Sequence, residues 1–127
     1  GYTATNTNGV YFYIENCTRG ANRNGNCAVG AVEQGTDKQM FADTLYFSSS
    51  EQSIELRIFV DQTFHEAYFQ NGRVAMTVNN PQQDNKLVYD QVALRSAEEV
   101  VVESVNIYQV DDIWTSTEEV LQTKRRD

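Results

Sequence analysis

The sequence predicts an all-β fold, specifically a two-sheet antiparallel β-sandwich of the jelly-roll or concanavalin-like type. Short segments alternate apolar and polar residues with a period of two, which is the pattern of half-buried strands. Turns rich in Asn, Gly, Ser and Asp separate these segments at a spacing typical of a sandwich. With 127 residues, of which 40% are hydrophobic, the chain is long enough to form one domain, 1–127, around its own core.

Eight strands are expected along the chain. They span residues 10–15, 27–33, 39–47, 54–60, 64–70, 74–79, 87–95 and 100–110. The single proline, Pro81, falls in a loop, where it interrupts no ladder. Ser116 and Glu119 have the spacing of a helix capping box, so the residues from about 115 to 127 are expected to form a short terminal helix or tail.

The central part of the chain predicts three consecutive strands. Asp61 and Thr63 can hydrogen-bond their own backbone, so residues 61–63 predict a tight corner after the strand 54–60. In the next strand the period of two places Glu66 and Tyr68 on one face and His65 on the other. The dipeptide Asn71-Gly72 tolerates positive φ and predicts a hairpin turn into the strand 74–79.

The two cysteines, Cys17 and Cys27, flank a polar, glycine-rich segment and predict a disulfide-closed hairpin. Asn16 opens an Asn-Cys-Thr glycosylation sequon, so it is a candidate glycosylation site. Both signals favour a secreted, extracellular or vacuolar protein. The alternative is a cytosolic protein with two free thiols and a sequon that occurs by chance.

The acidity of the chain excludes several partners. A net charge of −8 and a pI of about 4.5 make nucleic acid and anionic membranes poor partners. There is no apolar run of transmembrane length. The adjacent acidic pairs, such as Asp111-Asp112, lack the spacing of a calcium loop, and two cysteines with one distant histidine make no zinc site. We therefore expect neither a metal nor a cofactor.

Part of this sequence resembles a known family. Eight residues fall on the pattern LRxLVDxSxVExFxxGGRxxxT: Leu56, Arg57, Val60, Asp61, Glu66, Gly72, Arg73 and Thr77. The segments 9–14 and 105–114 resemble strands that flank it in the same order. This combination resembles the C-terminal β-sandwich of glycoside hydrolase family 32, the invertases and fructosidases.

The resemblance implies an accessory module and not a complete enzyme. In that family the catalytic carboxylates lie in a separate propeller domain, within NDPNG, RDP and EC motifs. None of these motifs occurs here. We therefore expect a chain that is not catalytic alone and that supports a propeller domain, carried by the same precursor or by a partner chain. A stand-alone lectin-like module and a structural subunit of an extracellular assembly are the alternatives.

Four residues form the candidate sugar-binding patch: Asp61, Glu66, Arg57 and Tyr68. Carboxylate, guanidinium and phenol groups suit the vicinal hydroxyls and the apolar face of a sugar, in this case a fructose-containing glycan. The alternative interpretation is that Asp61 closes the corner and Glu66 lies at the rim. His65 is expected to be packed or at an edge, and Trp114 to anchor the core or an interdomain surface.

Overall fold

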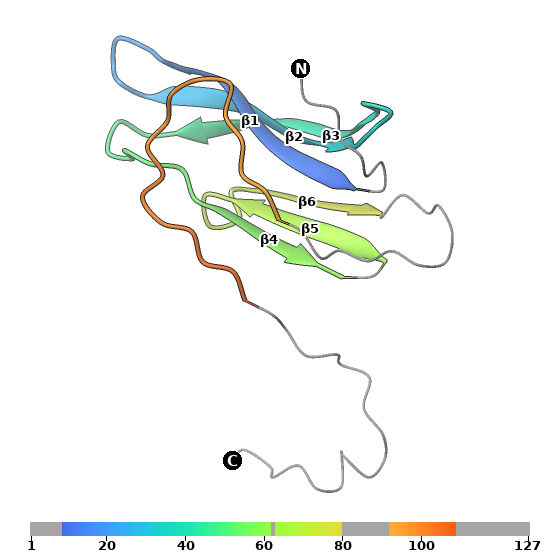
Figure 1. The fold of residues 1–127 in the computed structure, drawn as a ribbon. Helices are drawn as coiled ribbons and strands as arrows, with labels where there is room; N and C mark the ends of the chain where they lie inside the picture. Colours follow the sequence, from blue (N-terminus) through green and yellow to red (C-terminus); the bar gives the residue numbers. More distant parts are fainter. Residues whose placement is uncertain (1–8, 62, 80–91, 109–127) are drawn as a thin grey trace, which may run out of the picture. The chain divides into compact units, whose positions relative to one another are not determined.

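The computed structural model describes residues 9–61, 63–79 and 92–108, and within these ranges it contains six β-strands and no helix. The strands are β1 (Val10–Arg19), β2 (Gly25–Glu33), β3 (Gln39–Phe47), β4 (Leu56–Val60), β5 (Phe64–Phe69) and β6 (Val74–Asn79). They form two antiparallel sheets, sheet A with the order β1-β2-β3 and sheet B with the order β4-β5-β6 (Figure 1). The predicted all-β, two-sheet antiparallel fold is confirmed. The jelly-roll connectivity stays a prediction.

The contacts within the chain group into two units, Gly1–Val92 and Ala93–Asp127. All six strands belong to the first unit. The prediction of a single domain over 1–127 therefore stays a prediction.

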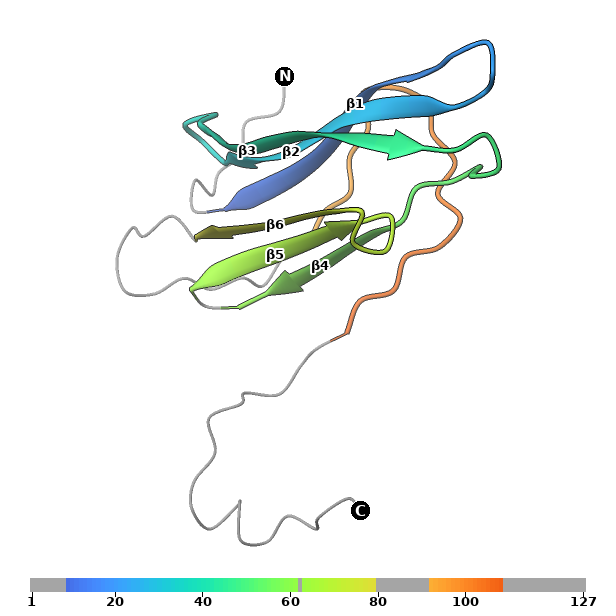
Figure 2. The ribbon, with the colours of Figure 1, turned by 180° about the vertical axis from the view of Figure 1, so that it is seen from behind.

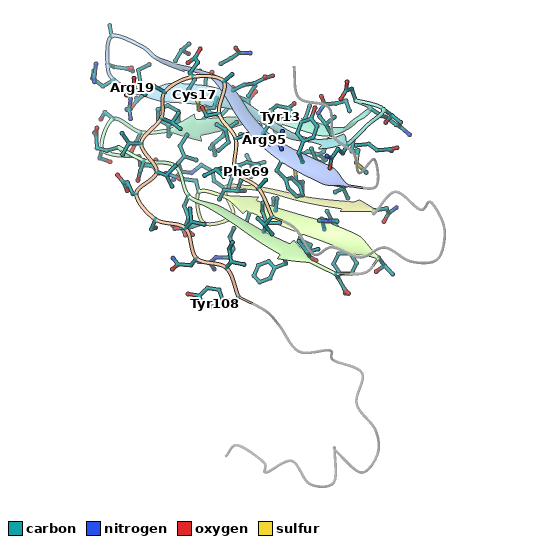
Figure 3. All side chains as sticks on the ribbon, in the orientation of Figure 1. Tyr13, Cys17, Arg19, Phe69, Arg95 and Tyr108 are labelled. Atoms are coloured by element: carbon teal, nitrogen blue, oxygen red, sulfur yellow. A yellow bond between two sulfur atoms is a disulfide. The ribbon has the colours of Figure 1, made fainter. Side chains whose placement is uncertain are left out.

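The hydrophobic core lies between the two sheets. Strand β5 shows how the sequence creates it, because Ala67 and Phe69 are fully buried while Glu66 and Tyr68 on the opposite face are only partly buried. The other members of the core cluster come from both sheets: Cys27, Val29, Ala31, Leu45, Phe47, Val74, Met76 and Val78. Burying a side chain such as Phe69, labelled in Figure 3, contributes about 1.5 to 3 kcal/mol. The turned view shows β3 of sheet A running beside β6 of sheet B, and these two strands are in contact (Figure 2).

The predicted disulfide between Cys17 and Cys27 is present and joins β1 to β2. In the β1–β2 ladder Glu15 pairs with Ala28 and Thr18 with Asn26. Two residues of β1, Asn16 and Cys17, therefore oppose one residue of β2, which is the definition of a β-bulge. Asn16, the first residue of the bulge, takes a left-handed conformation with φ of 53°, as the first residue of a G1 bulge does.

The first hairpin is longer than its prediction. Strand β1 continues to Arg19, whereas the sequence predicted that the first strand ends at residue 15. Strand β2 begins at Gly25, whereas a start at residue 27 was predicted. Asn24 explains the difference, because its carbonyl accepts the Gly20 N–H at 2.8 Å and closes a tight turn over residues 20–24. Arg23 has a φ of 69° within this turn. The other described strands agree with prediction to within two residues.

The two strands predicted nearest the C-terminus are wrong for the residues that the structure describes. Residues 92–95 and 100–108 form no strand, and the remaining residues of these two predicted strands, 87–91 and 109–110, lie outside the described ranges. The side chains of this segment are exposed, including Val101 at 90% and Tyr108 at 81%. Strand preference depends on a neighbouring strand and on burial of one face, and valine-rich sequence alone does not provide either. The predicted terminal helix at 115–127 also lies outside the described ranges.

Candidate functional site

Three of the four predicted site residues share the outer face of sheet B. The ladder places Arg57 of β4 beside Tyr68 of β5, and Phe59 of β4 beside Glu66 of β5. Directly paired residues of an antiparallel ladder point to the same side of the sheet. Because the other faces of β5 and β6 form the core, Arg57, Phe59, Glu66 and Tyr68 all lie on the face away from sheet A.

A depression of about 330 Å³ lies on this face. It is lined by Glu55, Arg57, Phe59, Tyr68 and Asn71. The Phe59 and Tyr68 rings meet edge to face, with centroids 5.9 Å apart. The Phe59 side chain is half exposed, so an apolar ring surface is open to a ligand beside charged groups. We name this set of five residues, together with Glu66, the sheet B patch.

Hydrogen bonds orient the polar groups of the sheet B patch. The Tyr68 hydroxyl donates to Glu66 Oε2 at 2.7 Å. This hydrogen bond, more than burial or charge, raises the pKa of the Tyr68 hydroxyl above its usual value of 10.0. Arg57 Nη2 lies 3.2 Å from Glu55 Oε1 in an exposed ion pair. The patch therefore presents two carboxylates, one guanidinium and one phenol around two aromatic rings.

Asp61 lies apart from the depression. Its backbone N–H donates to the Phe64 carbonyl at 2.9 Å and closes the corner between β4 and β5. Because Asp61 lies opposite Phe64, it is a diagonal neighbour of Glu66 on the outer face of sheet B. Neither Asp61 nor Glu66 lines the depression. The structure thus brings Arg57, Tyr68 and Glu66 together on the outer face of sheet B. It places Asp61 beside Glu66, at the corner between β4 and β5.

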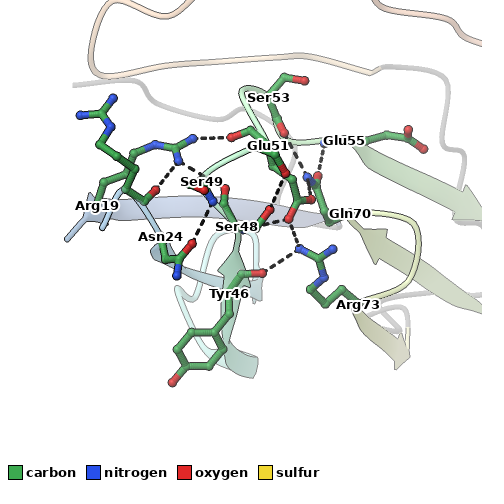
Figure 4. Close-up of polar contacts among 12 residues, drawn as sticks. Arg19, Asn24, Tyr46, Ser48, Ser49, Glu51, Ser53, Glu55, Gln70 and Arg73 are labelled. Carbon is green, nitrogen blue, oxygen red and sulfur yellow. Dashed lines mark hydrogen bonds and ion pairs between the residues drawn. The ribbon is translucent and has the colours of Figure 1, made fainter. Parts of the chain in front are cut away.

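A polar cluster centred on Glu51 holds the loops that border the patch (Figure 4). Arg73 Nη1 donates to Glu51 Oε1 at 2.7 Å and to the Tyr46 carbonyl at 2.9 Å. The Gln70 side chain donates to Glu51 Oε2 and to the Ser53 carbonyl, and its Oε1 accepts the Glu55 N–H at 2.9 Å. These contacts tie the β3–β4 loop to the β5–β6 turn, and the hydrogen bond from the Glu55 N–H holds the backbone of Glu55 beside the patch.

The same cluster connects sheet A to sheet B. Arg19 of β1 donates to the carbonyls of Arg23, Ser48 and Glu51, and its guanidinium carbon lies 4.7 Å from the centroid of the Phe47 ring. The depression of about 500 Å³ beside this cluster is lined by Asn24, Gly25, Tyr46, Phe47, Ser48, Glu51 and Arg73. Its charged side chains bind one another, so we interpret this end of the sandwich as structural.

The remaining predicted residues are placed as follows. Asn16 is exposed, as glycosylation requires. His65 is buried, at 4% exposure, with its ring 6.3 Å from that of Phe12, which agrees with the packed position expected for it. Trp114 lies outside the described ranges.

Two negative observations bear on the class of site. Over the described parts of the chain, no group of three or more His, Cys, Asp or Glu residues could hold a metal ion. The same parts contain no helix that is long and apolar enough to span a membrane.

Sequence reasoning missed three members of the patch, Phe59, Glu55 and Asn71. The signal for the first two was available, because the period of two that places Arg57 on the outer face places Glu55 and Phe59 there as well. Asn71 could not be assigned, because the direction of a turn residue depends on the geometry of the loop.

Comparison with known proteins adds no relative. No family model matches the chain, no curated protein matches it, and no solved structure matches its fold.

Proposed function

We propose that this chain is a non-catalytic, carbohydrate-binding β-sandwich module of a secreted fructosidase-like glycoside hydrolase, with the sheet B patch as its sugar contact. The half-exposed Phe59 ring, packed against Tyr68 and surrounded by charged side chains, is the observation that carries this proposal. Its location on a sheet face also matters, because the ladder holds the side chains in place before a ligand binds.

The chemistry of the patch matches the two kinds of surface that a sugar ring offers. The C–H groups on one face of the ring are apolar and can pack on Phe59. The hydroxyl groups at the rim can donate to the carboxylates of Glu55 and Glu66 and accept from Arg57. A hydrogen bond to a charged group contributes about 1.5 to 3 kcal/mol. A few such bonds with one stacked ring are enough for a weak but selective contact.

The proposed ligand class, catalytic partner domain and extracellular location are supported mainly by the sequence. The resemblance to the family 32 sandwich supports a link to fructose-containing glycans, and the missing propeller motifs support a role beside a separate catalytic domain. The disulfide is compatible with an extracellular location. The sequon supports the same compartment. A stand-alone lectin-like module would use the same patch, and the precursor sequence or a co-purified propeller chain distinguishes these two cases.

Calorimetric titration of the purified chain with fructose, levan and inulin tests the proposal. We expect binding to at least one of them, and we expect Phe59→Ala and Glu66→Gln each to weaken it about tenfold or more. Tyr11→Ala is the matched control, because Tyr11 is an aromatic residue of sheet A with a comparable exposure of 44%. Equal loss in the control, or no heat with any of the three sugars, would overturn the proposal.

Asp61 needs a separate test, because the hydrogen bond that closes the corner uses its backbone N–H and not its carboxylate. If the carboxylate contacts the sugar, Asp61→Asn weakens binding and leaves the melting temperature unchanged. If it only supports the corner, Asp61→Asn lowers the melting temperature and leaves the affinity unchanged. Thermal melts beside the titrations separate these two outcomes.

A further inference from the structure

Gln70 of the β5–β6 turn has a backbone conformation that its residue type does not favour. Its φ is 51°, in the left-handed region that glycine and asparagine tolerate better than glutamine. Strained residues of this kind cluster at sites where the strain serves a function. Asparagine or glycine would suit the backbone at this position, but neither has a side chain as long as that of glutamine. The side chain of Gln70 is therefore the group whose contacts matter.

The side chain of Gln70 completes a ladder pair that its own backbone leaves incomplete. Two residues that form a hydrogen-bonded pair in an antiparallel ladder exchange two N–H···O bonds. The Gln70 N–H donates to the Glu55 carbonyl at 2.8 Å, which is the first of these bonds. The Gln70 carbonyl accepts the Arg73 N–H at 3.3 Å within the turn, and the Glu55 N–H donates instead to Gln70 Oε1 at 2.9 Å. The side-chain amide thus takes the place of a backbone carbonyl and holds the residue that precedes β4.

The amide group of Gln70 is also anchored on its other side. Gln70 Nε2 donates to Glu51 Oε2 and to the Ser53 carbonyl (Figure 4). The acceptor and the donor nitrogen of this one side chain are therefore both used. Arg73 Nη1 holds the other oxygen of the Glu51 carboxylate at 2.7 Å. These contacts fix the position of Gln70 Oε1, the atom that receives the Glu55 N–H.

We infer, on the basis of the proposed sugar contact, that Gln70 is a positioning residue of the sheet B patch and acts on a ligand through Glu55. Glu55 and Asn71 line the depression; Gln70 bonds to the backbone of the first and precedes the second in the turn. The Glu55 side chain is 51% exposed, and its Oε1 lies 3.2 Å from Arg57. A held backbone thus places an accessible carboxylate beside the guanidinium. A group that is already oriented loses less freedom when a ligand binds.

Amide hydrogen exchange without any sugar tests whether Gln70 holds Glu55. Gln70→Met keeps the length of the side chain and removes its amide group. Gln70→Asn favours the left-handed conformation but is one methylene shorter, so it keeps the test decisive if the first variant does not fold. Glu55 and Asp61 both bond to β5, so alternation gives the Phe59 N–H the same direction. We expect the exchange rate of the Glu55 amide to rise about fivefold or more relative to that of Phe59 in each variant.

Calorimetric titration with fructose, levan and inulin tests whether this hold matters to a ligand. We expect Gln70→Met to weaken binding about threefold or more, because the ligand then has to order Glu55 itself. The loss should disappear in a Glu55→Ala background, where Gln70 has no carboxylate to position. Gln52→Met is the matched control, because Gln52 lies in the β3–β4 loop and donates to the Ser49 carbonyl at 3.1 Å. Its affinity should equal that of the wild type.

The outcomes separate the role of Gln70 from the proposed function. A Glu55 amide that exchanges as in the wild type in both Gln70 variants would overturn the inference while the sugar contact stands. An equal loss of affinity with and without the Glu55 carboxylate would do the same. A wild-type chain that binds none of the three sugars would overturn the proposed function, and with it the positioning role, even if the exchange rates change as expected.

Discussion

Three consecutive residues of the β5–β6 turn have backbone conformations that most residues avoid. Gln70, Asn71 and Gly72 have φ values of 51°, 57° and 89°. The Gly72 N–H donates to the Phe69 carbonyl at 3.2 Å, and the Arg73 N–H to the Gln70 carbonyl at 3.3 Å, so the strained residues lie within a bonded turn. Asparagine and glycine tolerate this region better than other residues. The predicted hairpin turn with a positive φ at Gly72 is confirmed, and its loop spans residues 70–73.

Gly72→Val is expected to lower the free energy of unfolding by about 1 kcal/mol or more, because a branched side chain is strained at positive φ. The Cβ would meet no close neighbour except Tyr68, at 3.9 Å, so the loss reports backbone strain and not a clash. Asn71→Gly is the matched control and should leave stability unchanged or raise it. Thermal or urea unfolding measures both. An unchanged midpoint for Gly72→Val would contradict the assigned turn.

Glu51 makes the stability of the fold depend on acidity. Its carboxylate accepts hydrogen bonds from Arg73, from the Ser48 N–H and from Gln70, and these lower its pKa from 4.5 to about 2. A carboxyl group whose pKa is lower in the folded state stabilises the protein above the unfolded-state pKa. This contribution is therefore complete above pH 4.5 and is lost as the pH falls toward about 2.

We expect Glu51→Gln to be less stable than the wild type at pH 7, and we expect the difference to shrink as the pH falls from 4.5 to about 2. Urea unfolding at several pH values measures it. Arg73→Gln removes the hydrogen bond that lowers the pKa of Glu51 most, and so it should shift the acid limb of the wild-type profile to higher pH. A stability difference for Glu51→Gln that is the same at pH 7 and pH 2 would contradict this account.

At the scale of elements, the two strands of the β1–β2 hairpin are joined both by a disulfide and by the hydrogen bonds of their ladder. The disulfide closes a loop with a sequence separation of 10, and the bulge sets the exposed Asn16 beside it. Cross-linking so short a loop stabilises the folded state by about 2 to 3 kcal/mol in the chain-entropy account. The half-cystine Cys27 is also a fully buried member of the core.

Replacing both cysteines by alanine is expected to lower the free energy of unfolding by at least about 2 kcal/mol, because the loop constraint and the packing at Cys27 are both lost. Thermal melts of the double variant and of the reduced wild type measure the two contributions. Alkylation of the native, unreduced chain provides the check on the bond itself. Two labelled thiols in that experiment would show that the bridge is absent.

Asn16 is expected to be glycosylated when the chain is produced through a secretory pathway, because its side chain is exposed on an edge strand. Intact mass before and after enzymatic removal of N-glycans detects the modification, and Asn16→Gln should abolish it. Thr18→Ala is a second variant that should abolish it while it leaves Asn16 in place. A single unmodified mass from a secreting host would contradict the prediction.

At the scale of the whole molecule, the described strands form a scaffold with a charged and aromatic outer face. The core residues of sheets A and B fill the interior, so the chemistry available to a ligand lies on the surface. The carboxylates of the sheet B patch are engaged with Tyr68 and Arg57.

The purified chain is expected to hydrolyse neither sucrose nor inulin. The three motifs that carry the catalytic carboxylates in family 32 enzymes do not occur in the sequence. Release of reducing sugar over several hours measures the activity, with a commercial invertase as the positive control. Turnover that survives further purification and disappears in Glu66→Gln would show that the patch is catalytic.

The sequence by itself determined that six strands lie at these places in the chain, although not the ends of the β1–β2 hairpin, and it determined the disulfide pairing and the turn at Gly72. Each of these depends on neighbouring residues: a period of two, a short loop between cysteines, or a residue that tolerates positive φ. The predicted strand 100–110 shows the limit of that reasoning. Its valines have the right preference, but only tertiary structure decides whether a neighbouring strand is present to pair with them.

The sheet B patch shows the same division between sequence and tertiary structure. Alternation determined that Glu55, Arg57 and Phe59 share one face of their strand and that Glu66 and Tyr68 share one face of theirs, whereas the ladder between β4 and β5 decided that the two sets lie on the same side of sheet B and that Asp61 lies outside the depression. Ladder register depends on contacts between residues distant in sequence, and these are formed only when the chain folds.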